Sequence, residues 1–178
     1  MAKTLTVLDL GSFETRSVLV KRSLTGELPQ VVGVGKRPSQ GIKKGLVVDI
    51  NEASQTIREV LEMVENTSGE RVGDLLIAVN GTNVLGTNTK GIVAVSRADK
   101  EITQSDVERA IKSAQATLAS PNREIIAVLP RGFCIDSEEG IKNPIGMDGI
   151  RLEADIVVIS ASSPFLRNLS KAVNLAGR

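Results

Sequence analysis

The alternation of strands and helices along this chain breaks after Asn80-Gly81-Thr82 and resumes near Ser160. A break of this kind constrains the fold strongly, because a module inserted into a host domain enters and leaves through an exposed connection of that host. We therefore expect two domains. The first is discontinuous and comprises residues 1–81 and 161–178, and the second is an inserted module at 82–160.

In the first domain, β-branched and apolar runs predict strands at 3–10, 15–22, 30–36 and 75–79, the first three as an antiparallel meander. Apolar residues then recur at helical spacing, at Ile57, Val60, Leu61 and Val64. This stripe predicts a helix with Asn51 as its N-cap and its end near Ser68-Gly69. A second helix is expected over 164–176.

In the inserted module, Thr103 and Asp106 are spaced as in a capping box and predict the start of a helix that Ser120-Pro121-Asn122 ends. The β segment at 124–136 contains Pro130, which favours a sheet edge or a bulge. A polar loop at 137–149 and a strand at 150–160 follow. The predicted class is α/β with a mixed sheet, carrying an inserted α+β module.

Composition excludes several functions for these 178 residues. The net charge is +1, from 22 basic and 21 acidic residues, and the only aromatic residues are three Phe, so neither charge nor base stacking favours nucleic acid. His is absent and Cys134 is the single cysteine, which excludes a disulfide framework and an N/S zinc site within the chain. No apolar run approaches membrane-span length and no signal-peptide core begins the chain, so we expect a soluble intracellular protein.

The turn Asp9-Leu10-Gly11-Ser12, between the first two strands, is the one candidate for phosphate binding. Glycine lets the backbone approach an anion closely, and successive N–H groups form a concave anion site. Asp9 could hold a hydrated Mg²⁺ through water, and Arg16 could supply positive charge. The same residues also form ordinary hairpin turns, and on this pattern alone the plain turn is favoured.

Several segments resemble the FtsA family of bacterial cell-division proteins, which are relatives of actin. The most specific is the run from Glu139 to Leu152, EGIKNPIGMDGIRL. In the same order along the chain come four shorter matches, at 8–12, 37–45, 78–81 and 102–107. Together they cover essentially the whole chain, but only about the first half of the family's length.

The resemblance implies an actin-like, RNase H-like fold, with 1–81 and 161–178 as part of subdomain 1A and 82–160 as the inserted subdomain 1C. It also implies that the hairpin is the family's first phosphate motif, and it implies no catalytic residue. The implied nucleotide-binding residues are Asp9, Gly11, Ser12, Phe13, Glu14, Thr15 and Arg16. Asp9 would contact Mg²⁺ through water. The family usually has Lys at the position of Arg16. We expect Glu14 either to point away from the phosphates or to lower the nucleotide affinity.

By the same resemblance, the function is that of a divisome scaffold that binds ATP and Mg²⁺ in the intact protein. Nucleotide binding by this chain should be weak or absent, because the family's second phosphate loop and adenosine pocket lie in its C-terminal half. We therefore expect the chain to be a piece of a longer protein. Implied partners are further copies in an actin-like filament, FtsZ, and late division proteins such as FtsN.

The implied location is the cytoplasmic face of the inner membrane at the division site, reached through a C-terminal helix of the family. We expect strand edges near 83–95 or 150–159 to accept another chain by β-augmentation. Two alternatives stay open: an actin-like ATPase switch that is active in its own right, and a pilus-assembly protein of the PilM type.

Overall fold

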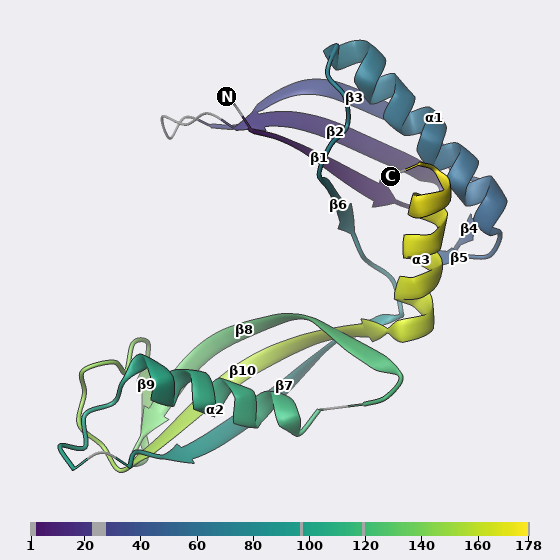
Figure 1. Ribbon diagram of the computed structural model, residues 1–178. Coiled ribbons are helices and arrows are strands. Elements are labelled where there is room, and N and C mark those ends of the chain that lie inside the picture. The colour runs from purple at the N-terminus through teal and green to yellow at the C-terminus, as the bar shows by residue number, and fades with distance from the viewer. Residues whose placement is uncertain (1–2, 23–27, 97, 119, 178) are drawn as a thin grey trace. The chain divides into compact units, whose positions relative to one another are not determined.

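The computed structural model describes residues 3–22, 28–96, 98–118 and 120–177. The chain divides into two compact units, residues 1–83 with 164–178 (unit 1) and residues 84–163 (unit 2). The division falls within a few residues of the expected limits. Both units are drawn in Figure 1.

Unit 1 is built on a four-stranded sheet of β1 (Lys3–Leu10), β2 (Glu14–Arg22), β3 (Gln30–Pro38) and β6 (Leu75–Ala78), in the order β3-β2-β1-β6. The first three strands are antiparallel neighbours, which confirms the predicted meander, and β6 runs parallel to β1. A short hairpin, β4 (Ile42–Lys43) with β5 (Leu46–Val47), precedes helix α1.

Helices α1 (Ile50–Ser68) and α3 (Ser163–Leu175) lie side by side, and an Arg58 Nη2 to Leu175 carbonyl bond of 2.8 Å joins them (Figure 1). The N-cap of α1 is Asp49, whose carboxylate accepts the N–H groups of Asn51 and Glu52, so the predicted cap Asn51 was two residues late. Asp49 is the cap because its extended backbone places its carboxylate over the free N–H groups of the first turn. Gly69, in the left-handed conformation, ends the helix as predicted.

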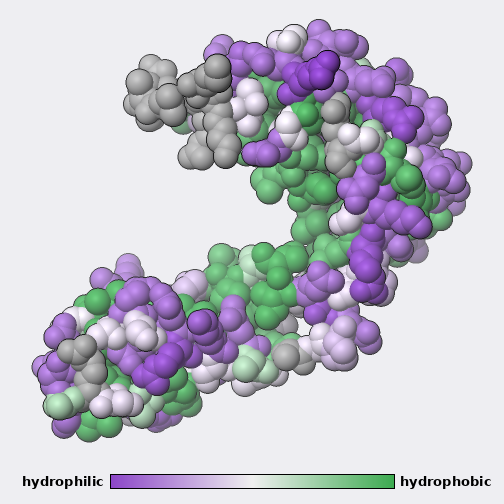
Figure 2. Space-filling view, in the orientation of Figure 1, coloured by the Kyte–Doolittle hydropathy of each residue, from purple (hydrophilic) through white to green (hydrophobic). Residues whose placement is uncertain are grey.

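The sheet of unit 1 is covered by α1 on one face, where Leu8, Leu19, Ile57 and Leu61 are buried. On the opposite face, apolar side chains stay exposed, and the space-filling view shows apolar residues at this surface (Figure 2). Those exposed by half or more are Val31, Val34 and Leu76.

Unit 2 has a sheet of its own. Its strands are β7 (Val84–Ala94), β8 (Arg123–Ile135), β9 (Glu138–Ile141) and β10 (Arg151–Ser162), antiparallel and in the order β7-β10-β8-β9. Helix α2 (Gln104–Ala116) packs on one face of β7 and β10. The core between them is separate from that of unit 1 and includes Ile102, Ala110, Leu152, Ala154 and Ile156.

Three sequence-based expectations for this unit need correction. The strand expected at 150–160 exists, but β10 lies between β7 and β8, so it offers no free edge for another chain. The predicted polar loop contains β9, because the left-handed backbone at Asp136 and Ser137 turns the chain back onto β8. Helix α2 ends at Ala116, before Ser120-Pro121-Asn122.

Two other expectations for unit 2 are confirmed. Pro130 lies at a register shift between β8 and β10, outside the part of β8 that pairs with β9, so no strand needs its missing N–H. The capping box is present, since the Thr103 N–H donates to the Asp106 carboxylate over 2.9 Å.

No helix among the described residues combines the length and the apolar character needed to cross a membrane.

Asp106 carries the strongest local electrostatic effect in unit 2. Its side chain is 7% exposed, and it accepts hydrogen bonds from the Thr103 hydroxyl, the Thr103 N–H and the Arg109 guanidinium. These donors lower the pKa of Asp106 to about 2 from 3.8, mainly through Thr103. The carboxylate therefore stabilises the folded state above the unfolded pKa.

We predict that this contribution, about 2 kcal/mol, is lost as the pH falls from about 4 to about 2. Urea unfolding of the wild type and of Asp106→Asn should give free energies that differ near neutral pH and converge below pH 2. Amide exchange of α2 assigns the change to unit 2. A pH-independent difference would contradict the assignment.

We also predict that Gly91→Ala destabilises unit 2. A Cβ at Gly91 would collide with the Ala110 carbonyl oxygen and the Ala114 nitrogen, both backbone atoms of α2. The helix must then move off the sheet, at a cost of roughly 1–3 kcal/mol in urea unfolding. Gly86→Ala in the same strand is the control, because its Cβ would have only Val157 Cγ1 within reach, at 3.8 Å. Equal losses in both variants would disprove the packing argument.

Candidate functional site

The candidate site is the hairpin between β1 and β2, where Asp9 pairs with Arg16 and Leu10 with Thr15. Buried and exposed residues alternate along both strands, so Thr15 faces the core side and Asp9, Glu14 and Arg16 share the other face. The turn itself is made by Gly11, Ser12 and Phe13. The predicted residues are therefore brought together, but they point in two directions.

Residue 11 must be a glycine because the backbone of the turn passes close to it. A Cβ there would lie 2.7 Å from the Glu14 carbonyl oxygen, closer than real Cβ atoms come. The chain thus folds back on itself tightly, and the backbone at this point has no side chain of its own to keep a ligand away.

Beneath the turn, Ser39 ties the hairpin to the segment that follows β3. The Ser39 hydroxyl donates to the Gly11 carbonyl over 2.7 Å, and the Ser39 N–H donates to the Phe13 carbonyl over 3.0 Å. Since the one hydroxyl proton of Ser39 is used, Thr15 Oγ1 is the donor in its 2.8 Å bond to Ser39 Oγ. Thr15 is fully buried. Its side chain therefore holds the turn from below and does not reach the open face.

Ser39 was missed as a site residue by the sequence reasoning, although it lies within the matched segment 37–45. Its role depends on a contact across 28 residues of sequence, which no local pattern reports.

Above the turn, Ser12 and Asp9 meet two other loops. The Ser12 hydroxyl accepts the Gly45 N–H over 2.8 Å, and Asn80 Nδ2 donates to Asp9 Oδ1 over 3.4 Å. Asn80 lies two residues after the end of β6, which is parallel to β1, so the carboxyl ends of these two strands bring Asp9 and Asn80 together. Gly45, Asn80 and Ser12 form a polar rim of backbone, amide and hydroxyl groups beside the Asp9 carboxylate.

Glu14 does not point away from the face that carries Asp9, which leaves a lower nucleotide affinity as the expectation for this residue. It shares the face of Arg16, and Arg16 Nε donates to Glu14 Oε2 over 2.6 Å. The Arg16 side chain is 63% exposed and that of Glu14 20% exposed. The two opposite charges balance each other, so the hairpin offers an anion less positive charge than Arg16 alone would.

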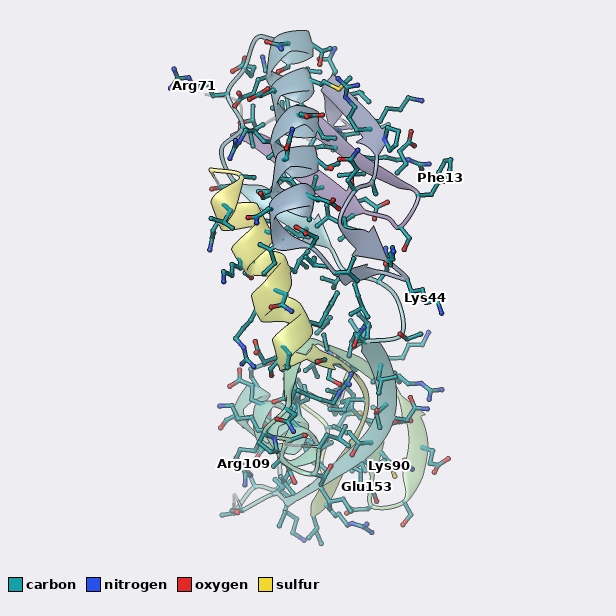
Figure 3. The ribbon with its side chains drawn as sticks, turned by 90° about the vertical axis from the view of Figure 1, so that its right-hand side faces the viewer. Phe13, Lys44, Arg71, Lys90, Arg109 and Glu153 are labelled. Carbon is teal, nitrogen blue, oxygen red and sulfur yellow. The ribbon has the colours of Figure 1, made fainter. Side chains whose placement is uncertain are left out.

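Phe13 takes no part in this arrangement. It projects from the tip of the hairpin into solvent and is 88% exposed (Figure 3). Only its backbone can contribute to a site here. Among the described residues, no group of three or more His, Cys, Asp or Glu could hold a metal ion.

A small hollow of about 210 Å³ lies in unit 2, lined by charged residues of β7, β8, β9 and β10. Two of its carboxylates are paired: Glu139 with Lys90 at 3.9 Å, and Glu153 with Arg151 of the same strand at 2.8 Å. It is smaller than the roughly 300–1,000 Å³ of most ligand pockets, so we assign no small-molecule site to it.

We predict that Ser39→Ala loosens the hairpin. The change leaves the buried Thr15 hydroxyl without its acceptor and the Gly11 carbonyl without its donor, which should cost about 1–2 kcal/mol. Amide exchange at residues 12–14 should become faster. Ser12→Ala is the control, because its bond to Gly45 is exposed and its loss should cost less. Unchanged exchange in Ser39→Ala would contradict this role.

The chain is similar in sequence to bacterial cell-division proteins. A family model described as "SHS2 domain inserted in FTSA" matches residues 81–160. The chain is 38% identical over 178 residues to the cell division protein FtsA of Borreliella burgdorferi, covering 99% of this chain and 43% of that protein. It is 35% identical to FtsA of Bacillus subtilis, covering 96% and 38%, and 29% identical to FtsA of Escherichia coli, covering 96% and 40%.

A solved structure titled "PilM-PilN type IV pilus biogenesis complex" superposes with a TM-score of 0.62 over 97% of this chain and 44% of that one, at 16% identity. At this identity the likeness concerns the fold alone, and the fold is of the actin-like type shared by PilM and FtsA. The chain spans about two fifths of the length of the curated relatives named above. Relatives named FtsA align along nearly all residues of this chain, which corresponds to the N-terminal part of these proteins.

Proposed function

We propose that this chain supplies one wall of an ATP site and a protein-binding subdomain to a bacterial cell-division scaffold. The observation that carries the proposal is the hairpin, in which Gly11 and Ser12 form an open turn beside Asp9 at the carboxyl ends of β1 and β6. The relatives that align with nearly the whole chain are named cell division proteins, which supports the biological role.

The turn would bind phosphate oxygens through its backbone N–H groups and the Ser12 hydroxyl, at a point where Gly11 leaves the backbone uncovered. Asp9 lies on the open face of the hairpin, beside this turn. It would hold Mg²⁺ through water, since Mg²⁺ prefers oxygen ligands and retains part of its hydration shell. Thr15 and Ser39 would act as positioning residues that hold the turn from below.

The site in this chain is one-sided. A nucleotide needs enclosing surfaces to bury most of its area, and the hairpin with Gly45 and Asn80 lines only one side. We propose that the rest of the ATP site lies in the longer part of the relatives, so this chain alone binds ATP weakly.

For the whole protein, we propose assembly with the cell-division apparatus. Unit 1 would be the first part of subdomain 1A and unit 2 would be subdomain 1C. The proposed partners are further copies in a filament, FtsZ and late division proteins such as FtsN, at the cytoplasmic face of the membrane, which a C-terminal helix of the intact protein would reach.

Of the two alternatives, the PilM type is supported by fold at 16% identity, whereas the FtsA relatives reach 38%. An ATPase active in its own right would require this chain to bind nucleotide tightly, so affinity separates it from the proposed scaffold.

We predict that titration of the 178-residue chain with Mg·ATP shifts amide resonances only near residues 9–16, 45 and 80, with millimolar affinity. Arg16→Ala should weaken binding several-fold, because Glu14 then faces the phosphates uncompensated. Glu14→Gln should strengthen binding several-fold for the same reason.

Two results would change the assignment. Shifts that avoid the hairpin, or none at all, would refute the phosphate-binding wall. Micromolar affinity would favour the self-sufficient ATPase.

A further inference from the structure

The outer edge of β7 is long and regular. This strand has eleven residues, and every one of them pairs with β10 without a register shift. It lies at the end of the sheet order β7-β10-β8-β9, and no described strand pairs with its other side. The free edge of a strand presents unpaired N–H and C=O groups that can pair with another chain.

The other sheet edges in the described residues are protected. Strand β3 contains Pro38 at its end and pairs with β2 across a register shift. Strands β6 and β9 have four residues each. Short strands, proline and bulges are among the devices by which proteins prevent edge pairing. Strand β7 has none of these three, and Lys90 is its one charged residue.

The direction of the polar groups on β7 follows from two hydrogen bonds. The Val95 N–H donates inward to the Ile150 carbonyl over 2.8 Å. The neighbouring Ala94 carbonyl points the other way and accepts Arg109 Nη2 over 3.1 Å. Because direction alternates along an antiparallel strand, the N–H and C=O groups of Gly86, Asn88, Lys90 and Ile92 also point outward.

Charge indicates which kind of segment fits this edge. Lys90 is the only charged residue of β7, and its side chain is 55% exposed. Arg109, 47% exposed, reaches the same edge from α2 on the other face. Figure 3 shows the two on opposite sides of unit 2. Lys90 lines the same hollow as Glu139, Glu153 and Asp155, of which Asp155 is its direct partner on β10. Its ion pair with Glu139, at 3.9 Å, is long and exposed, and a carboxylate of the partner could replace it at little cost.

A second copy of β7 fits this edge poorly. An antiparallel pair centred on residue 89, the middle of the strand, sets the two Lys90 side chains diagonally opposite on one face. Diagonal neighbours lie about 7–8 Å apart, close enough for like charges to repel.

We propose that the β7 edge binds an extended acidic segment of a partner protein, which adds as a fifth strand to the sheet of unit 2. Backbone bonds to Gly86, Asn88, Lys90 and Ile92 provide the affinity, and carboxylates facing Lys90 and Arg109 provide the preference. This inference rests on the proposed protein-binding role of unit 2 and names the surface that performs it.

The test uses the 178-residue chain and two capped heptapeptides, one of alternating Glu and Val and one of alternating Lys and Val. The acidic peptide should bind, slow the amide exchange of the four outward N–H groups, and lose affinity as salt increases. The basic peptide should bind at least tenfold more weakly. Lys90→Glu should reverse this preference.

Asn88→Pro removes one outward N–H while leaving the pairing with β10 intact, since only the outer edge loses a donor. It should reduce binding of the acidic peptide at least tenfold, with the circular dichroism spectrum unchanged. Asn143→Pro, in the loop after β9, is the surface control and should bind the acidic peptide normally.

No binding of the acidic peptide, equal binding of the basic one, or normal binding by Asn88→Pro would each overturn the inference. Self-association of the chain that Asn88→Pro abolishes would assign the edge to a second copy instead. The Mg·ATP titration concerns unit 1 only, so the nucleotide site and the β7 edge can fail independently.

Discussion

In both units, a helix backbone lies directly against a strand at glycine. Any side chain at Gly35 would collide with the Val60 carbonyl of α1, and any side chain at Gly91 would collide with α2 at Ala110 and Ala114. Because the helix must approach this closely to bury its apolar stripe, the positions of α1 and α2 depend on these glycines. In each unit, the rest of the core packs around this contact between helix and strand.

In unit 1, the packing of α1 leaves one face of the sheet free, and the candidate hairpin lies at the end of the two central strands. Its geometry is held by Ser39 from below and by Gly45 and Asn80 from above. A turn held on both sides loses little conformational entropy when an anion binds, which is the physical advantage of a preorganised backbone site. The Arg16–Glu14 pair limits the charge available there.

In unit 2, α2 covers one face and leaves the long edge of β7 open. The network of Asp106, Thr103 and Arg109 both caps the helix and places a guanidinium at that edge. A single local arrangement therefore links the stability of the helix to the charge of the proposed binding surface.

The sequence alone predicts the elements that have strong local signals. These are the meander, the apolar stripe of α1 and its end near Gly69, the capping box at Thr103 and the irregularity at Pro130, because each depends on residues close together in the chain. The motif residues of the hairpin were also visible, although their role as a nucleotide site stays a prediction. Only the tertiary structure decided that β10 is central, that Ser39 supports the turn, and that Glu14 shares the face of Arg16. These depend on which distant strands pair and on side-chain alternation within the paired sheet, and no local pattern encodes such long-range pairing.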